Sequence, residues 1–258
     1  MRIVCLCNNW LGWQVLQWLA NQGQEIVGLV VHHAAEGKCL DEIRSAGERA
    51  GCVVFEDSFL STPEGLAQIR ACKADIAISV LFRNILRKPF LDLFPKGCLN
   101  LHPAYLPYNR GNYPNVWSIV EKTPAGVTLH YVDEGLDTGD IIAQEKVAVE
   151  MTDTGGTLYR KLELAALDLF QRTWPLVESG HAPRRQQSAA PGTSHRRADV
   201  AAIDEIDLAH MYRAEDLINI LRARTFPPYL GTYFRHNGKK VYLSLELSEA
   251  PEGGKSSK

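Results

Sequence analysis

The chain has 258 residues, of which 45% are hydrophobic and 22% are charged, and its formal net charge is −2. These values are ordinary for a globular protein, and the length allows one large domain or two modest ones. The slightly acidic balance argues against a basic surface for nucleic acid, and the sequence has no run of 18 apolar residues to span a membrane. We therefore expect a globular protein that binds neither nucleic acid nor a membrane.

The N-terminal part alternates short apolar runs with amphipathic segments. The opening run is interpreted as a core strand rather than a signal peptide, because no small-residue cleavage site follows it. Strands are predicted over 2–7, 25–33, 51–56, 75–81 and 97–103. The spacing of apolar residues predicts helices over 11–23, 38–50, 62–72 and 87–94. This alternation is typical of an α/β fold, in which a parallel sheet carries helices on both faces.

The pattern changes after residue 117. A strand over 126–135 and a second over 140–149 are predicted to pair antiparallel, and a long amphipathic helix capped by Thr154 follows. Residues 180–197 are rich in Pro, Gly, Ser and Arg, as is typical of a linker or a surface excursion.

A small C-terminal region follows this segment. It has a helix near 213–224 and a hairpin signal at Asn237-Gly238, and the tail after it has the composition of a disordered segment.

The chain has six cysteines and no CxxC pair, and no histidine cluster flanks them: Cys5, Cys7, Cys39, Cys52, Cys72 and Cys98. Cys5 and Cys7 would share one face of a strand, which indicates core positions. We interpret all six as reduced thiols of a cytoplasmic protein, and we predict no metal site.

The stretch 100–117, NLHPAYLPYNRGNYPNVW, is poor in helix and strand formers and is predicted to be an active-site loop. Asn100 and His102 would share one face at the carboxyl end of a strand, where α/β sheets bind ligands. Asp137 follows a later strand in a turn bounded by glycines. An amide, an imidazole and a carboxylate could stabilise an oxyanion and transfer a proton, although each alone is more often structural.

These residues resemble a known family. Three motifs are similar to those of formyltransferases that use 10-formyltetrahydrofolate. They are N-L-H-P-A-Y-L-P at 100–107, the Arg-Gly pair after it, and G-L-D-T-G-D-I-I at 135–142. The resemblance implies a Rossmann-like catalytic domain over 1–180. The rest of the chain divides into a linker over 181–202, a small C-terminal α+β module over 203–248 and a disordered tail over 249–258.

The resemblance also implies roles for individual residues. An amine would attack the formyl carbon, with His102 transferring a proton and supporting the oxyanion. Asn100 would polarise the formyl oxygen, and Asp137 would hold the imidazole or relay the proton. The folate-pocket residues implied are Phe82, Arg83, Asn84, Ile85, Leu86, Asp133, Gly135 and Asp137. The candidates for substrate binding are Asn9, Trp10, Tyr105, Arg110, Gly111, Asn112 and Tyr113, and Trp10 could equally be a core residue.

The version of the loop in this chain looks most like the sugar-nucleotide branch of the family. The expected acceptor is an amino-dideoxy sugar on a nucleoside diphosphate, often dTDP, as in the synthesis of a lipopolysaccharide O-antigen. By analogy with that branch, the short C-terminal module is expected to form a homodimer. A longer, basic C-terminal domain would be expected of an enzyme that acts on methionyl-tRNA.

Other functions stay open at this point. Formyl transfer to methionyl-tRNA or to another small amine metabolite is the first alternative. A relative that binds folate or a nucleotide without turnover is a second, against which the intact Asn100, His102 and Asp137 argue. NAD is not expected, because the first strand–helix turn, CNNWLG, lacks the dinucleotide fingerprint.

Overall fold

The structure, a computed structural model, describes residues 1–35, 37–187 and 192–250. The predicted tail, 249–258, falls outside these residues except for its first two positions. Four residues within the predicted linker also lie outside them.

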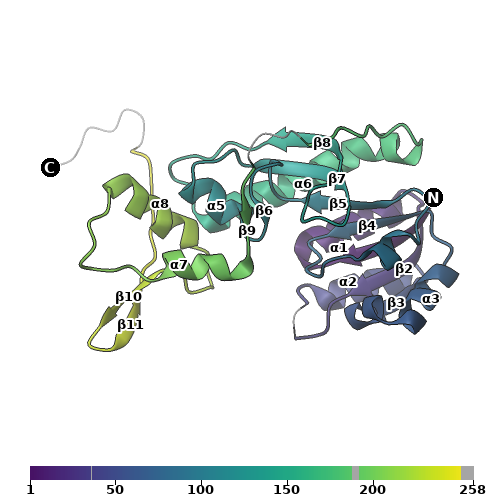
Figure 1. Cartoon of the computed structure of the whole chain (residues 1–258), viewed down its shortest axis with the longest axis horizontal. Coiled ribbons are helices and arrows are strands. Elements are labelled where there is room, and N and C mark those ends of the chain that lie inside the picture. The colour runs from purple at the N-terminus through teal and green to yellow at the C-terminus, as the bar shows by residue number, and fades with distance from the viewer. Residues whose placement is uncertain (36, 188–191, 251–258) are drawn as a thin grey trace.

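A seven-stranded sheet forms the centre of the N-terminal part (Figure 1). The strands lie in the order β3-β2-β1-β4-β5-β7-β8; they run parallel from β3 to β5, whereas β7 and β8 are antiparallel to their neighbours. They are β1 (Arg2–Cys7), β2 (Glu25–Val31), β3 (Val53–Glu56), β4 (Ile76–Val80), β5 (Cys98–His102), β7 (Gly126–Tyr131) and β8 (Ile141–Lys146). The predicted mostly parallel, Rossmann-like sheet is thereby confirmed.

Helices cover both faces of this sheet. Alternate residues of β1 divide between two cores: Cys5 and Cys7 join one, and Val4 and Leu6 join the other. The first core is closed by α1 (Asn9–Asn21), α2 (Leu40–Arg49) and α6 (Gly155–Glu178), and the second by α3 (Pro63–Ala71) and α4 (Lys88–Leu91). The two cysteines therefore share a core face as predicted, and all six thiols are free.

The long helix α6 begins as the sequence predicts. Thr154 caps it, and Thr157 completes a reciprocal capping box with the Thr154 backbone. The strand predicted over 126–135 ends earlier, at Tyr131, because the segment after it leaves the sheet as a turn.

The small C-terminal part consists of α8 (Ala214–Arg224) and a hairpin of β10 (Tyr233–His236) and β11 (Lys239–Tyr242). It lies at one end of the long axis, at the left of Figure 1. The hairpin turns at Asn237 and Gly238, which both have positive φ, as the Asn-Gly signal predicts.

A buried arginine attaches α8 to the larger part. Arg222 is 5% exposed, and its NH1 donates to the backbone oxygens of Glu150 at 2.8 Å and Asp153 at 2.9 Å. Both carbonyls lie just before α6, so this contact joins the two parts of the chain.

The stretch 100–117 is not wholly a loop. It contains the short strand β6 (Arg110–Gly111), and its end enters helix α5 (Pro114–Val120). Proline at the first turn favours a helix start, because its missing N–H would have no partner there. The remaining α5 side chains are mostly buried, so packing rather than local propensity stabilises this helix.

The segment predicted as a linker also has regular structure where it is described. It contains β9 (Ser194–His195), η2 (Arg197–Val200) and the start of α7 (Ala201–Asp204), and β9 pairs in parallel with β6. Arg185 pairs with Ile141 at the start of β8. The segment after α6 therefore folds back onto the loop that follows β5.

In the parts of the chain that the structure describes, no helix is both long and apolar enough to cross a membrane. Within the same residues, no cluster of His, Cys, Asp and Glu has the arrangement of a metal site.

Candidate active site

Strand β5 carries two of the predicted residues to the carboxyl end of the parallel strands. Asn100 and His102 lie two positions apart, so they share one face, while Leu99 and Leu101 point into the opposite core. His102 is buried and Asn100 is half-buried. A rigid central strand thus fixes the spacing of both side chains.

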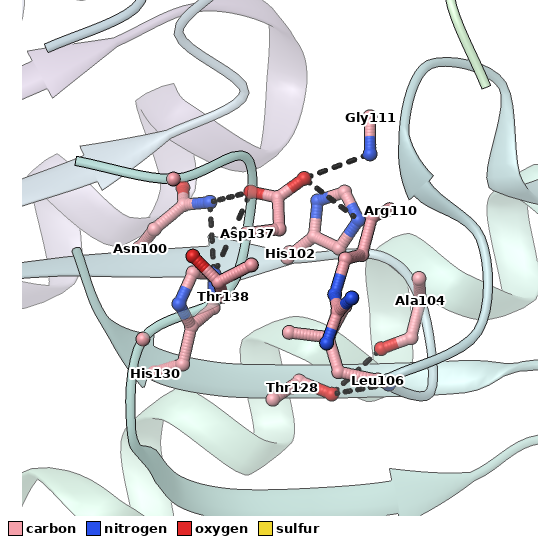
Figure 2. Close-up of polar contacts among 12 residues, drawn as sticks. Asn100, His102, Ala104, Leu106, Arg110, Gly111, Thr128, His130, Asp137 and Thr138 are labelled. Carbon is pink, nitrogen blue, oxygen red and sulfur yellow. Dashed lines mark hydrogen bonds and ion pairs between the residues drawn. The ribbon is translucent and has the colours of Figure 1, made fainter. Parts of the chain in front are cut away.

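Asp137 lies in the turn between β7 and β8 and joins this pair (Figure 2). Its Oδ1 lies 3.3 Å from Nδ2 of Asn100, and its Oδ2 lies 3.6 Å from Nε2 of His102. The backbone N–H of Gly111 donates to Oδ2 at 2.8 Å. Asp137 has a φ of 51°, a left-handed conformation that costs an L-residue roughly 1 kcal/mol and has to be held by its surroundings.

The environment of Asp137 favours its ionised form. Burial by itself would raise its pKa, but His102, His130, the N–H of Gly111 and the charge of Arg110 together lower the pKa below its usual value. The carboxylate is therefore charged at neutral pH.

His130, on β7, is a further member of the site that the sequence analysis did not single out. Its Nε2 lies 3.2 Å from Nδ2 of Asn100 and 3.7 Å from Oδ1 of Asp137, and its Nδ1 lies 2.7 Å from the backbone oxygen of Tyr131. Burial lowers the pKa of His130 to about 4, and the nearby Asp137 only partly offsets this. The ring is neutral at pH 7, with its hydrogen on Nδ1 and a lone pair on Nε2.

The amide of Asn100 is therefore held by the protein. Its Nδ2 lies within hydrogen-bond distance of acceptors on both His130 and Asp137 (Figure 2). The amide nitrogen has two hydrogens, so both have partners in this arrangement. To donate a hydrogen bond to a substrate oxygen, the Asn100 amide has to give up its contact with either His130 or Asp137.

The imidazole of His102 is held by a buried asparagine. Its Nε2 lies 3.3 Å from the backbone oxygen of Asn109, which is fully buried with a φ of 55°. The Asn109 amide donates to Ser118 at 2.9 Å and to Thr123 at 2.8 Å, and its backbone N–H donates to Thr193 at 2.8 Å. Because the neighbours of Nε2 are oxygen acceptors, Nε2 carries a hydrogen in either charge state of the ring.

Gln187 joins the Asp137 turn to Arg110. Its amide nitrogen donates to the backbone oxygens of Asp137 at 2.7 Å and Gly139 at 2.9 Å, and its Oε1 accepts from NH2 of Arg110 at 2.6 Å. The buried Nε of Arg110 has no partner within the described residues. Gln187 lies in the predicted linker, where a Pro- and Ser-rich composition gave no signal of a site.

The predicted folate-pocket segment, 82–86, follows β4. Phe82 stacks on His32, Arg83 donates its backbone N–H to the same ring, and Asn84 contacts Asp57. Leu86 is buried, whereas Ile85 is 64% exposed.

The second predicted pocket loop follows β7. Oδ1 of Asp133 accepts from the N–H of Gly135 at 3.0 Å and from the hydroxyl of Thr138 at 2.7 Å, so Asp133 stabilises the turn itself. Strands β4 and β7 are the two neighbours of β5, which carries Asn100 and His102. Because β7 is antiparallel to β5, the loop after it starts beside Leu99 and returns to Asn100 and His102 through Asp137.

Two of the predicted substrate residues, Asn9 and Trp10, lie where β1 enters α1. Nδ2 of Asn9 donates to the hydroxyl of Tyr159 at 2.7 Å, and Arg160 lies 3.8 Å from the ring centre of Trp10. Trp10 is half-buried and packs against the core, so it is both a packing residue and partly accessible.

Five predicted substrate residues lie in the segment after β5, and one of them, Arg110, contacts Gln187 as described above. Gly111 has a φ of 88°, and a Cβ there would come within 2.4 Å of the oxygen of His195, so glycine is required by the β6–β9 contact. Asn112 is exposed, Tyr113 forms the start of α5, and Tyr105 packs over Gly126. The backbone of Gly111, rather than a side chain, thus reaches Asp137.

Comparisons with known proteins give matches over both parts of the chain. Residues 43–173 match the family described as "Formyl transferase", and residues 199–249 match "N-formyltransferase dimerization C-terminal domain". Over 233 residues, the chain is 32% identical to the methionyl-tRNA formyltransferase of Geobacillus thermodenitrificans. The aligned region covers 87% of this chain and 70% of that protein.

Solved structures are similar over nearly the whole chain. A 4-N formyltransferase from Francisella tularensis is 25% identical with a TM-score of 0.81, over 96% of this chain and 98% of the other. A formyltransferase from Anoxybacillus kamchatkensis, in complex with UDP-4,6-dideoxy-4-formamido-L-AltNAc and tetrahydrofolate, is 27% identical with a TM-score of 0.59, over 86% and 98% of the two chains.

Proposed function

The chain belongs to the formyltransferase family, and we propose that it transfers a formyl group from 10-formyltetrahydrofolate to the amino group of a nucleotide-linked amino sugar. The observation that carries the proposal is the contact of Asp137 with both Asn100 and His102, at 3.3 and 3.6 Å. An amide, an imidazole and a carboxylate at the end of a central strand are the groups that acyl transfer to an amine requires.

The reaction consists of two bond changes at one carbon. The amine attacks the formyl carbon, which forms the new C–N bond and places the carbonyl electron pair on oxygen. Collapse of this tetrahedral intermediate breaks the bond from the carbon to N10 of the folate, and N10 receives the proton that the amine loses. The protein has to stabilise the oxyanion and move this proton.

The arrangement of the side chains suggests how they divide this work. His102 carries a hydrogen on Nε2, so in the neutral ring Nδ1 has the lone pair that can take up the amine proton. The ionised Asp137, 3.6 Å away, stabilises the imidazolium that results. Asn100 donates an amide hydrogen to the oxyanion, and His130 and Asp137 set the orientation of that amide.

The residues around the site fit a folate. Its pterin needs a donor–acceptor edge and apolar contacts, and the segments after β4 and β7, the strands on either side of β5, have backbone N–H and C=O groups that could match it. Ile85 on one loop is 64% exposed and Leu136 on the other is 46% exposed, so each loop offers an accessible apolar side chain to a ligand. We propose Phe82–Leu86 and the turn from Asp133 to Asp137 as the two sides of this pocket.

Several observations favour a sugar nucleotide as the acceptor. The C-terminal part matches the short N-formyltransferase module, and the A. kamchatkensis relative was solved with a UDP-linked formamido sugar. Among the residues that the structure describes, Nε of Arg110 has no partner, and this guanidinium beside the site could bind a phosphate or a hydroxyl group. Asn9, Trp10, Tyr105, Gly111, Asn112 and Tyr113 remain candidates for contacts to the sugar or nucleotide.

Methionyl-tRNA is the alternative acceptor, and one observation favours it. The chain is 32% identical to a methionyl-tRNA formyltransferase over most of its length. Its formal charge of −2 argues the other way, because RNA binding is driven largely by neutralisation of phosphates.

One assay separates these acceptors. The purified chain is mixed with 10-formyltetrahydrofolate and a panel of amino sugars linked to dTDP, UDP or GDP, with methionyl-tRNA in a parallel reaction. Release of tetrahydrofolate and the product mass are followed. A formyl mass on a sugar nucleotide is expected, first on a dTDP-linked sugar, and such a product would suit the synthesis of an O-antigen. Formylation of the tRNA alone would overturn the proposal.

We also propose that the chain forms a homodimer through its C-terminal part. Residues 199–249 match a dimerization domain, and the same region exposes large apolar side chains, among them Leu208, Met211, Leu230 and Tyr242. A two-stranded hairpin buries little surface by itself and is stabilised by a partner. Sedimentation of the full chain tests this: a monomer at micromolar concentration would contradict it.

A further inference from the structure

We infer that His32 is a positioning residue for the segment 82–86, which it fixes through the backbone N–H of Arg83. Only the identity of the ligand, a folate, rests on the proposed function. The ring of His32 lies outside the group formed by Asn100, His102 and Asp137, and the chemistry described above does not use it.

The position of His32 in the sheet explains why it can reach this segment. His32 follows β2, Asp57 follows β3, and Arg83 follows β4. The strand order places β1 between β2 and β4, so a contact from His32 to Arg83 crosses the carboxyl end of β1. His32 is 1% exposed, so the ring itself is shielded from water, whereas Arg83 lies at the surface.

The contacts of the ring are specific. Nδ1 lies 2.8 Å from Oδ2 of Asp57, and Nε2 lies 3.1 Å from the backbone nitrogen of Arg83. Phe82 stacks on the ring with a centroid distance of 4.4 Å and an angle of 12°, and Asn84 donates to Oδ2 of Asp57 at 3.0 Å. Three consecutive residues of the segment therefore touch His32 or its partner.

The hydrogen positions follow from the partners. A backbone N–H can only donate, so Nε2 of His32 has to present a lone pair to Arg83. The ring hydrogen is then on Nδ1 and is donated to Asp57. Burial by itself would raise the pKa of Asp57, but the hydrogen bonds from His32 and Asn84 outweigh it and lower the pKa. A charged Asp57 thus selects the tautomer that binds the segment.

This arrangement has a consequence for ligand binding. Ile85 is highly exposed and follows directly after the three anchored residues, so the anchor determines where the exposed part of the segment lies. A loop that is ordered before binding loses little conformational freedom when the ligand binds, so the protein binds the ligand more tightly. Loss of the acceptor on His32 should weaken folate binding without affecting the reacting groups.

Two isosteric variants separate the two ring nitrogens. His32→Gln places an amide oxygen near the position of Nε2 and keeps an acceptor for Arg83. His32→Asn places an amide nitrogen near the position of Nδ1 and keeps a donor for Asp57, but has nothing to accept from Arg83. The neighbouring His33 is exposed, and His33→Asn is the matched control.

The first measurement is amide hydrogen exchange of a peptide that spans 82–86, in the free full-length chain. Protection should fall in His32→Asn and persist in His32→Gln and His33→Asn. The second is the Kd of 5-formyltetrahydrofolate by calorimetry, which should rise about tenfold in His32→Asn and less than about threefold in His32→Gln. The KM for the formyl donor should follow this Kd, with kcat at saturation nearly unchanged.

The two measurements distinguish a failure of this inference from a failure of the proposed function. Unchanged protection in His32→Asn would overturn the positioning role, whatever the ligand is. An equal loss of protection in the Gln and Asn variants would show a general effect of replacing a buried ring and would also overturn it. Changed protection in a chain that binds no folate would instead reject the folate and leave the anchor established.

Discussion

Nδ2 of Asn100 lies 3.2 Å from Nε2 of His130, which stands directly opposite it on the antiparallel strand β7. The hydrogen of the His130 ring is engaged by the backbone oxygen of Tyr131, so Nε2 offers only a lone pair. The Asn100 amide is thereby oriented from a neighbouring strand, which is a more rigid support than a loop.

Removal of this acceptor should slow the reaction. In His130→Leu, one hydrogen of the Asn100 amide loses its partner, and we expect kcat to fall about tenfold. His130→Gln keeps an acceptor near the position of Nε2 and should retain more of the activity. Steady-state kinetics with the preferred acceptor measure both. Equal losses in the two variants would contradict an orienting role for the ring.

The same histidine should make stability depend on pH. Its pKa is lowered from 6.5 to about 4 in the folded chain. As the pH falls from about 6.5 to about 4, the unfolded chain binds a proton that the native ring does not, so the free energy of unfolding falls by up to about 3 kcal/mol. The contribution of His130 to the free energy of unfolding is constant above about pH 6.5 and below about pH 4.

Urea unfolding at several pH values tests this relationship. His130→Gln lacks the titrating ring, so its free energy of unfolding should depend less on pH over the same interval. Parallel pH dependences for the two proteins would show that His130 titrates at its ordinary pKa in the folded chain.

The three proposed catalytic side chains should be needed for turnover but not for folding. Asn100→Ala, His102→Ala and Asp137→Asn should each lower kcat on the order of 10²–10⁴-fold. Circular dichroism and the unfolding midpoint show whether each variant remains folded. Near-normal turnover in a folded variant would remove that residue from the mechanism.

Gln187 should be required to hold the Asp137 turn. Gln187→Ala removes both hydrogen bonds to the carbonyls of Asp137 and Gly139, and we expect kcat to fall about tenfold. Gln187→Glu should be at least as impaired, since a carboxylate cannot donate to these carbonyls, although it would pair better with Arg110.

The exposed neighbour Gln186 provides the control for this experiment. Gln186→Ala should leave kcat and KM unchanged. If Gln187→Glu were fully active, activity would depend on the contact of residue 187 with Arg110. The Asp137 turn would then be stable without the hydrogen bonds from the Gln187 amide.

Arg222 should determine how firmly the C-terminal part is attached. Arg222→Met keeps much of the volume but leaves the carbonyls of Glu150 and Asp153 without this donor, and we expect the chain to lose about 2–3 kcal/mol of unfolding free energy. The exposed Arg213, at the start of the same helix, gives the control variant Arg213→Met. Thermal unfolding measures both, and similar midpoints would contradict the prediction.

Much of the fold could be predicted from local patterns. Short stretches of sequence contain the patterns that predict these features, because each depends on residues close together in the chain. They are the five parallel strands, the cap of α6 at Thr154 and the Asn237-Gly238 hairpin. Helix α5 was missed because its sequence has weak helix propensity and its stability comes from burial.

The sequence by itself determined which residue types are available for chemistry: Asn100 and His102 on one face of a strand, and Asp137 in a turn bounded by glycines. The tertiary structure alone decided the neighbours that orient them. His130 depends on the register between β5 and β7, and Gln187 depends on how the segment after α6 folds back, 50 residues from Asp137. Strand register and long-range packing are set by the burial of the whole core, which no short window of sequence contains.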